Sequence, residues 1–472
     1  MSASDAGHSR SNTVVADDYP DFPKDPRLRR TIPPNNTDRA RTLVLCFDGT
    51  GDQFDSDNSN VVNFFSLLKK DDPRAQLVPV SGPYCIPDVA SPLAAKISRM
   101  IDSMIGIHLD AHVMGGYEFL MQNYEAGDKI CIFGFSRGAY TARALRRDVR
   151  FIRSAFSLDA ITKQVPFAYR MYSREDELGW AQSAAFKKAF SIDVDIDFPR
   201  RMGHRRFSRD HPPSTPLHGF EYARDGTSAM RLALDERRVR FRPSLWHRAR
   251  HDVEPMGVKP GEMPKPKRHN SSKPHPHREK TLPQREREYD STYSSCHVDT
   301  PTDVEEVWFA GCHCDVGGGS VANDVTNNLA RIPFRWMIRQ CFLVNTGIMF
   351  HRELLRQFGL EPSMLYPVVK PRPPPITDLP HPSESSSSSG TLALAPMWWI
   401  LELLPAKVRY QKKDDTWGKT ITMNKGQPRH IPRQRKQGIK VHRTVKLRME
   451  SKHVEGGYEP KAGWIVEPTW VD

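Results

Sequence analysis

The sequence predicts an α/β fold with a mainly parallel sheet flanked by helices. Three short apolar runs, TLVLCF (42–47), KICIF (129–133) and EVWFAG (306–311), are typical of buried strands. Stretches with the apolar spacing of helices lie between and after them, and glycine-rich turns follow the strands. Strands that alternate with helices favour a parallel sheet covered on both faces.

The first strand runs straight into a glycine turn, Asp48-Gly49-Thr50-Gly51. Residues 60–68 (NVVNFFSLL) then have helical spacing, and residues 94–124 predict a longer helix. Five apolar residues in that second stretch recur at i, i+3, i+4, i+7 and i+8, which places them on one helix face: Ile97, Met100, Ile101, Met104 and Ile105.

The second strand is followed directly by Gly134-Phe135-Ser136-Arg137-Gly138 and by the helical segment AYTARAL. The third strand is followed by AGCHCDVGGGS, in which three consecutive glycines, 317–319, let the backbone approach another segment closely. Both turns therefore join a buried strand to a region with unusual backbone freedom.

Composition divides the rest of the chain. Residues 1–40 are polar, rich in proline and aperiodic, which predicts a disordered tail. We expect one α/β domain over residues 41–370, with a disordered Pro/His/Lys insertion at about 247–300. A Ser/Pro-rich linker (371–391) and a basic C-terminal segment (392–472) follow.

Positive charge is concentrated in two regions. The chain has 69 Lys+Arg against 56 Asp+Glu, a formal net charge of +13. Residues 247–288 hold eleven Lys/Arg against six acids, and residues 406–448 hold fourteen against two. Aromatic residues in the first region are too few to stack bases, so no nucleic-acid partner is expected. An anionic membrane surface is a candidate partner of the second region, since each basic residue near such a surface contributes about 1 kcal/mol.

Composition also bounds the location and the cofactors. The apolar run MWWILELL is far shorter than the roughly 20 residues of a membrane span, and no secretory signal opens the sequence. Seven cysteines, an odd number, argue against a disulfide framework and for a reducing compartment. We therefore expect a cytoplasmic protein. The triplet Cys312-His313-Cys314 lacks a second ligand pair, so no metal or other cofactor is expected.

The motif Gly134-x-Ser136-x-Gly138 stands between a strand and a helix, which is the context of a nucleophilic serine. Such a turn needs small residues on both sides and holds the serine in a strained backbone. The amide of Arg137, at the start of the following helix, is a candidate donor to an oxyanion. The alternative is a purely structural strand-to-helix turn.

A nucleophilic serine needs a base, and His313 follows Ser136 in the chain order of this type of hydrolase. The structural alternative is a buried histidine in a tight turn. His442 is a competing base, but the basic residues around it would disfavour the imidazolium formed during catalysis. The amides of Gly49 and Thr50 are candidates for completing the oxyanion hole, with Asp48 ordering their loop or serving as an ordinary turn residue.

Four segments together resemble a known family: LVLCFDGTGD, the run from His112 to Leu145, LALDERRVRF and VWFAGCHCDVGGG. They are similar to the α/β-hydrolase family that includes type VI secretion phospholipase effectors (the Tle-type catalytic domain), which also has fungal members. The resemblance covers roughly residues 41–360, and WWILELLPAKVRY and VHRTVKLRM resemble the C-terminal part of fungal members. It implies a Ser-Asp-His triad that cleaves phospholipid esters, with Ser136 as nucleophile and His313 as base.

Two stretches depart from the family pattern. After the elbow helix the chain reads RRDVRFIRSAF, and residues 199–226 replace the strand that in the family ends with the triad aspartate. We hypothesise that both are alternatively spliced or misassigned coding segments; finding them in frame in the mature transcript would contradict this. Candidate replacements for the acid are Asp195 or Asp197, which end the preceding strand-like run, and Asp315, which is close to the base in sequence.

The sequence thus predicts a serine hydrolase acting on phospholipid or other esters with Ser136 and His313. Loss of the acid removes control of the imidazole tautomer, which lowers kcat about 10⁴-fold in the serine protease example. The alternative is a catalytically inactive hydrolase-fold protein that acts in protein or membrane interaction.

Overall fold

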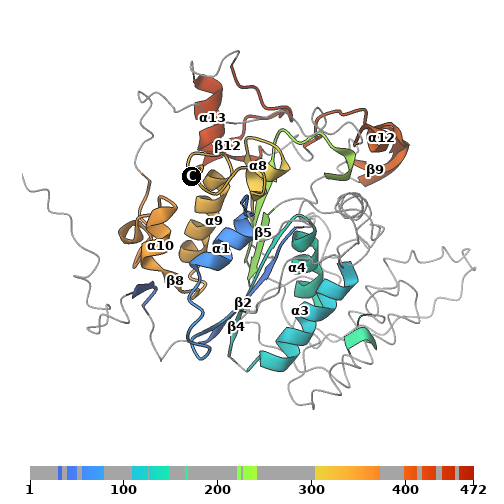
Figure 1. Cartoon of the computed structure of the whole chain (residues 1–472). Coiled ribbons are helices and arrows are strands. Elements are labelled where there is room, and N and C mark those ends of the chain that lie inside the picture. Colours follow the sequence, from blue (N-terminus) through green and yellow to red (C-terminus); the bar gives the residue numbers. More distant parts are fainter. Residues whose placement is uncertain are drawn as a thin grey trace, which may run out of the picture.

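The computed structural model of the chain describes these residues: 30–34, 40–49, 56–78, 109–125, 127–148, 165–167, 169, 220–224, 227–241, 303–372, 398–411, 417–431, 438–451 and 457–472. The predicted insertion at 247–300 lies outside them, as does the linker except for its first two residues. One large sheet runs through the described part, with helices on both sides (Figure 1).

The sheet has eight strands in the order β12-β11-β7-β6-β5-β4-β2-β3. Their bounds are β2 (Thr42–Phe47), β3 (Gln76–Leu77), β4 (Lys129–Phe135), β5 (Phe220–Arg224), β6 (Thr227–Ala233), β7 (Asp303–Phe309), β11 (Lys440–His442) and β12 (Thr469–Val471). Every neighbouring pair is parallel except the two that involve β5, which runs antiparallel to both β4 and β6. The predicted α/β fold with a mainly parallel sheet is confirmed.

Burial explains why the central strands read as continuous apolar runs. All six residues of β2 are buried, and so are six of the seven residues of β4. A strand covered by helices on both faces has no solvent side, so it has no polar alternation. Strand β4 extends two residues beyond the predicted end and includes Gly134 and Phe135.

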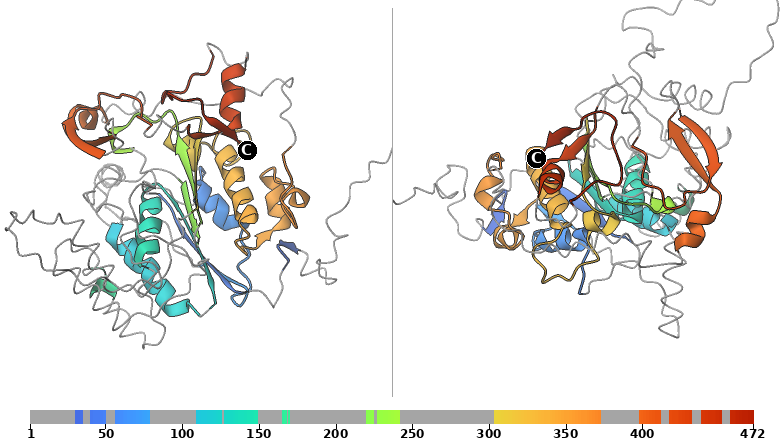
Figure 2. Two further views of the ribbon diagram at one scale, coloured as in Figure 1. Left: turned by 180° about the vertical axis from the view of Figure 1, so that it is seen from behind. Right: turned by 90° about the horizontal axis from the view of Figure 1, so that it is seen from above.

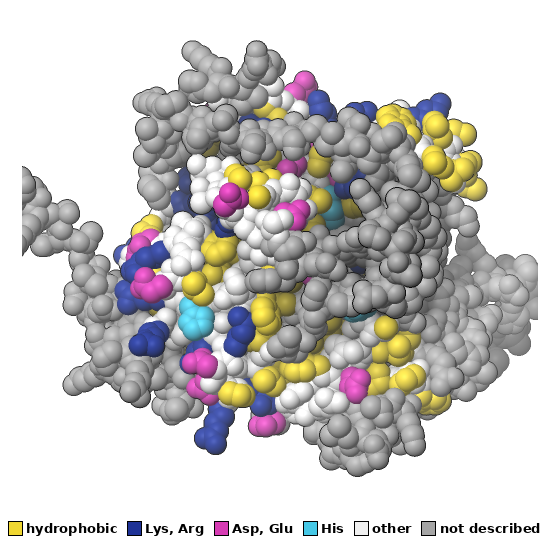
Figure 3. Space-filling model, in the orientation of Figure 1, with side chains coloured by type: hydrophobic (Ala, Val, Ile, Leu, Met, Phe, Trp, Pro, Cys, Tyr) yellow, Lys and Arg dark blue, Asp and Glu magenta, His cyan; other side chains and the backbone are white. Residues whose placement is uncertain are grey.

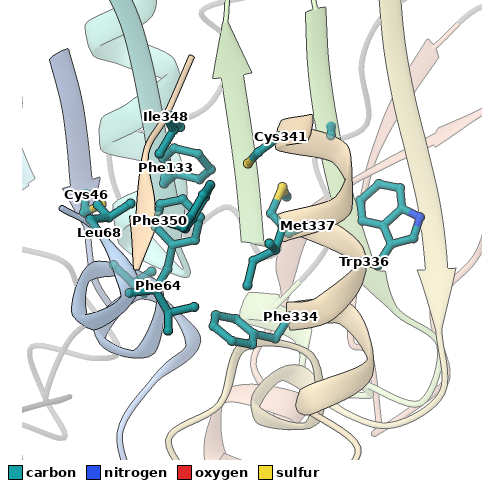
Figure 4. Close-up of a cluster of buried hydrophobic side chains, with 14 of the residues drawn as sticks. Cys46, Phe64, Leu68, Phe133, Phe334, Trp336, Met337, Cys341, Ile348 and Phe350 are labelled. Carbon is teal, nitrogen blue, oxygen red and sulfur yellow. The ribbon is translucent and has the colours of Figure 1, made fainter. Parts of the chain in front are cut away.

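One face of the sheet is covered by α1 (Asn60–Leu67) and α9 (Arg331–Leu343). Helix α1 matches its predicted range to within one residue, and the Ser59 hydroxyl accepts the amides of Val61 and Val62 as its N-cap. Between the helices and the sheet lies an aromatic cluster (Figure 4), in which the ring centroids of Phe64 and Phe133 are 4.2 Å apart.

The opposite face is covered by α3 (Leu109–Asn123) and α4 (Arg137–Asp148), as the views from behind and from above show (Figure 2). Helix α3 forms the described end of the long helix predicted over residues 94–124; residues 94–108 lie outside the described part. Tyr117 and Leu120 of α3 and Leu145 of α4 pack on alternate residues of β2 and β4. The two helix layers enclose the sheet that carries the GxSxG turn.

Strand β5 is a feature that the sequence did not predict. It forms within residues 199–226, where we found no strand pattern, and it joins β6 through a short turn. Phe220 is paired with Phe135 and Glu221 with Gly134, so β5 begins beside the end of β4. The place next to the GxSxG strand is therefore occupied by a strand of reversed direction.

Short strands also lie within the predicted N-terminal tail and the predicted C-terminal segment. Strands β11 and β12, in the predicted C-terminal segment, extend the same sheet beyond β7. Strand β1 (Thr31–Ile32), in the predicted tail, is buried and pairs with β8 (Phe350–His351). These strands have two or three residues each, too few to show a periodicity.

The C-terminal segment adds four further elements, namely α12 (Trp398–Leu403), the hairpin strands β9 (Ala406–Gln411) and β10 (Trp417–Thr422), and α13 (Arg443–Glu450). Val445 of α13 and Ile431 pack against Trp308 of β7 in a third hydrophobic cluster. Among the described helices, none is both long and apolar enough to cross a bilayer.

Replacing Gly138 by alanine should destabilise the protein, because the new methyl group would lie 2.1 Å from the Phe47 carbonyl oxygen, a backbone atom. Gly115 in α3 is the matched control: nothing lies within 4 Å of its Cβ position, and alanine favours a helix interior by about 1 kcal/mol. Thermal unfolding should give a lower midpoint for Gly138→Ala and an unchanged or higher one for Gly115→Ala. Equal midpoints would contradict the close approach.

Candidate active site

The turn between β4 and α4 holds Ser136 in a left-handed conformation, with φ +55°. A residue with a Cβ atom rarely adopts this conformation, which stores about 1–3 kcal/mol of strain and often occurs at functional sites. The strand ends at Phe135 and the helix begins at Arg137, so Ser136 alone makes the change of direction. Its backbone lies at the carboxyl end of β4, beside the N-terminus of α4.

Two glycines make this turn possible. A Cβ atom on Gly134 would lie 2.2 Å from the carbonyl oxygen of Gly138, and one on Gly138 would lie 2.1 Å from that of Phe47. Both obstacles are backbone atoms, which have no rotamer to change. The spacing of the GxSxG motif is therefore required by contact between the elbow and the end of β2.

The loop after β2 is ordered by Asp48. Its carboxylate accepts the amide of Gly49 at 2.7 Å and the hydroxyl of Ser59, the α1 cap, at 2.6 Å. Burial raises the pKa of Asp48 to about 6, although both hydrogen bonds act to lower it. Because the Gly49 amide donates to Asp48, this structure does not present it to an oxyanion, contrary to the role expected from sequence. Thr50 lies outside the described residues.

His313 begins the short helix α8 (His313–Gly317), directly after β7, and is buried. Its ring stacks on Phe135, with 4.5 Å between ring centroids, and meets the edge of Phe241 at 4.9 Å. A Cβ atom on Gly317 would lie 1.7 Å from the Phe135 ring, so the glycine run after His313 lets α8 settle against the elbow. The structure thus brings His313 to the residue that precedes Ser136.

The electrostatic surroundings of His313 favour a neutral ring. Burial lowers its pKa well below the usual value, and the positive charges of Arg238 and Arg429 lower it further. A neutral imidazole is the form that accepts a proton. The same two charges oppose the imidazolium that such a transfer produces.

A buried acid that the sequence did not single out supports this region. Glu236 lies in the LALDERRVRF segment, after β6, and accepts the His313 amide at 3.2 Å. Arg238 donates to both of its oxygens, at 2.9 and 2.8 Å. Although burial acts to raise the pKa of Glu236, the hydrogen bonds and charge of Arg238 and the charge of Arg429 lower it to about 2.

The same network reaches Phe241 and the C-terminal segment. The Arg238 guanidinium lies 3.4 Å from the centre of the Phe241 ring, over its face. Arg429 donates to the carbonyl oxygens of Ala233 at 2.8 Å and of Phe241. In the sequence, Glu236 and Arg238 have the charges of an exposed surface. Only the resemblance of LALDERRVRF to a family segment pointed to them.

Of the candidate acids, the structure describes Asp315, and its carboxylate is engaged elsewhere than on the His313 ring. The Asp315 carboxylate accepts the Cys312 amide at 2.7 Å, and so it caps its own helix. Burial raises the pKa of Asp315 to about 6. Asp195 and Asp197 lie outside the described residues. Within the described part, no hydrogen bond joins the Ser136 hydroxyl to the His313 ring, and the Asp315 carboxylate does not bond to that ring.

His442 is separated from the elbow by β5, β6 and β7. It caps α13, with its Nδ1 atom 2.8 Å from the Thr444 hydroxyl, and stacks on Phe309. Burial lowers its pKa to about 3, assisted by the charges of Arg372, Arg443 and Arg335. The structure does not bring His442 to Ser136. Among the described residues, no group of three or more His, Cys, Asp or Glu side chains forms a metal site.

Removing the charge of Glu236 with Glu236→Gln should lower the free energy of unfolding at pH 7 by up to about 3 kcal/mol, the linkage value of a pKa shift from 4.5 to about 2. The depressed pKa stabilises the fold above pH 4.5, and this contribution is lost as the pH falls towards 2. The difference between wild type and variant, measured by denaturant titration at several pH values, should narrow over that range. Glu353→Gln, at an exposed ion pair of α10 (Arg352–Gln357), is the control and should change little; a pH-independent difference would contradict the linkage.

Comparison with known proteins identifies a family. The family model described as "T6SS, Phospholipase effector Tle1-like, catalytic domain" matches residues 41–215 and 223–340. The matched residues include the Asp48 loop, the GxSxG turn, the pair Glu236 and Arg238, and His313. The uncharacterized protein YEL023C of Saccharomyces cerevisiae (strain ATCC 204508 / S288c) is 22% identical over 546 aligned positions, which cover 86% of this chain and 79% of that protein. No solved structure matches the chain. The chain belongs to the family of Tle1-like phospholipase effector catalytic domains.

Proposed function

We propose that the protein is a serine ester hydrolase that cleaves phospholipids. The observation that carries this proposal is the strained elbow: Ser136 at φ +55° between β4 and α4, with the His313 ring stacked on the preceding residue. The phospholipase family to which the chain belongs makes a lipid ester the favoured substrate. Substrate class and residue roles are both part of the proposal.

In this mechanism the Ser136 Oγ attacks the ester carbonyl carbon while His313 accepts the hydroxyl proton. The carbonyl oxygen becomes an oxyanion, which the amide of Arg137 at the N-terminus of α4 stabilises. The protonated His313 then gives its proton to the leaving alcohol, and an acyl-enzyme remains. A water molecule, deprotonated by His313, then attacks the acyl carbon. As the bond between the acyl carbon and Ser136 Oγ breaks, His313 returns the proton to that oxygen, which releases the fatty acid and restores Ser136.

We assign the triad acid to Asp197, which ends the strand-like run before residue 199 in the sequence. Within the described part, β5 begins beside Phe135, so it offers no residue after its end to the elbow. An acid is needed because Arg238 and Arg429 oppose the imidazolium of His313. With a carboxylate against the ring the imidazolium is stabilised; without one the rate should be low.

The C-terminal segment offers a surface for the lipid phase. The carboxylate of Glu402, on α12, is buried and accepts the amides of Val239 and Gly426 at 2.5 and 3.1 Å and the side-chain amide of Asn424 at 2.6 Å. The apolar side of α12 consequently faces outwards. This is the reverse of the usual arrangement in a soluble helix.

Six large apolar side chains of this region are between 38% and 65% exposed: Trp399, Ile400, Leu403, Leu404, Ile421 and Met423. They gather over α12 and the β9–β10 hairpin, at the upper right of Figure 3. We call them the α12 patch. The sequence around the hairpin is strongly basic, and a tryptophan with aliphatic neighbours beside basic residues is typical of an interfacial membrane anchor. Because Val239 starts the 3₁₀ turn Val239–Phe241, the patch is connected to the residue that touches His313.

A fluorophosphonate probe should label the wild-type protein at Ser136, and Ser136→Ala should abolish the labelling. His313→Ala should slow it by about 10²-fold or more, the usual contribution of a general base. Since the pKa of His313 is lowered, the ring stays neutral below pH 6.5, and the labelling rate should hold at mildly acidic pH.

Ser66→Ala, at an exposed serine of α1, is the matched control and should label as the wild type does. Hydrolysis of a phospholipid in mixed micelles should follow the same order among the variants. Failure of a folded wild-type sample to react with the probe would contradict the enzymatic proposal.

The second candidate is an inactive hydrolase-fold protein that acts at membranes or with other proteins. The observation that favours it is the reversed direction of β5, beside the nucleophile strand, where the family places the strand that carries its acid. Under this reading the α12 patch would still bind lipid, whereas no ester would be cleaved.

Binding of vesicles that contain anionic phospholipid should depend on the α12 patch. The double variant Trp399→Ser/Leu403→Ser should lower the bound fraction in a sedimentation assay several-fold, because it removes two large apolar side chains from the lipid-facing side. Ile465→Ser is the control, since Ile465 is 77% exposed but lies outside the patch. Equal binding by the double variant and the control would exclude this surface.

A further inference from the structure

On the far side of β7 from the elbow, four arginines converge from three segments. Arg335 and Arg339 lie one turn apart on α9. Arg372 is the last residue of the described run 303–372, and Arg443 is the first residue of α13. We call these four residues the arginine cluster. Arg372 and Arg443 both contact the Asp472 carboxylate, and Arg339 donates to the carbonyl oxygen of Lys370, two residues before Arg372. The charge of Arg335 also acts on Arg372.

One carboxylate faces the cluster in the described part of the chain, that of Asp472. It is 3.1 Å from the Nε of Arg443 and 3.5 Å from an Nη of Arg372. Arg339 donates instead to the Lys370 carbonyl oxygen at 2.9 Å, and Arg335 donates to the Arg331 carbonyl oxygen at 3.3 Å. Among the described residues, the Asp472 side chain is thus the carboxylate that contacts this group of four arginines.

Part of this charge is sheltered from water. Arg339 is buried, and burial, together with the neighbouring arginines, lowers the pKa of Arg372 to about 10 although Asp472 opposes this. Removing a guanidinium from water without a counter-charge costs several kcal/mol. The arrangement is thus poorly balanced unless a further anion is bound.

Two buried nitrogen atoms at this place have no hydrogen-bond partner in the structure: an Nη of Arg372 and the Nε2 of His442. The His442 side chain is fully buried, and the charges of Arg372, Arg443 and Arg335 all act on it. Its Nδ1 accepts the Thr444 amide, so a neutral ring carries its proton on Nε2. Both atoms are therefore N–H donors that await an acceptor.

We propose that the arginine cluster and His442 form a binding site for a phosphorylated ligand. Guanidinium groups bind phosphate in a bidentate manner, and a phosphate group supplies several acceptor oxygens with a charge near −2, which suits several converging donors. Strands β5, β6 and β7 separate this site from Ser136. It is therefore distinct from the proposed hydrolase site and does not depend on ester hydrolysis.

Thermal unfolding of the full chain should reveal the site. Inorganic phosphate or inositol hexakisphosphate should raise the midpoint above that in sodium chloride of equal ionic strength, because a ligand that binds only the folded state stabilises it. Arg335→Gln should weaken the ligand affinity, measured by calorimetry, by about tenfold or more. Arg335→Lys keeps the charge but not the bidentate guanidinium, so its ligand affinity should lie between those of the wild type and Arg335→Gln. Arg356→Gln, at an exposed ion pair on α10, is the control and should bind as the wild type does.

A second experiment distinguishes a small phosphorylated ligand from a lipid headgroup. It compares sedimentation of the protein with vesicles that contain a phosphoinositide and with vesicles of equal charge that contain phosphatidylserine. Binding of the soluble phosphates supports a small phosphorylated ligand; preference for phosphoinositide vesicles that Arg335→Gln abolishes supports a lipid headgroup. No effect of either beyond that of ionic strength, or equal effects in wild type and in both Arg335 variants, would overturn the proposal. Arg335→Lys serves as the test variant if Arg335→Gln does not fold.

Discussion

Contact between the end of β2 and the start of α4 governs the geometry around Ser136. The Phe47 carbonyl oxygen leaves no room for a Cβ atom at position 138, and this proximity forces the chain to turn within one residue. The next links are polar: Asp48 holds Ser59, and Ser59 forms a bridge with Gly318 beyond His313. Three motifs that are far apart in sequence are thereby joined through backbone atoms and one carboxylate. The position of the elbow depends on how tightly these segments pack.

The His313 side of the site depends on a different interaction, namely the buried pairing of Glu236 with Arg238. Arg429, from the C-terminal segment, joins it by bonding to carbonyl oxygens on either side of this region. The C-terminal segment is therefore part of the support of the site and also completes the sheet. Two of its arginines have different partners: Arg429 supports the site, and Arg443 belongs to the arginine cluster beyond β7.

Local patterns predicted the elements that are long and apolar enough to show them. TLVLCF and NVVNFFSLL gave β2 and α1, and the strand–turn–helix context of Ser136 identified a turn whose backbone is indeed strained. Strands β5, β11 and β12 were not predicted, because their pairing is set by the neighbouring strands rather than by their own few residues. Glu236 was not predicted because a charged run such as DERR has the composition of a surface, and one of the charges that act on it, Arg429, lies far along the chain. His313 was identified from chain order and from the family resemblance, whereas its contact with Phe135 is a tertiary property.

The direction of β5 has a consequence for the evolution of the site. In a parallel strand, the residues that reach the catalytic edge lie just after the strand, where a fixed turn limits how they vary. Here β5 begins at that edge, with Phe220 beside Phe135, and ends at the opposite edge with Arg224. A mutation that supplied a carboxylate directly after β5 would therefore place it at the far edge of the sheet from Ser136. In this chain a new acid cannot arise at the end of the strand next to the nucleophile strand, so β5 itself limits where the site can gain a carboxylate.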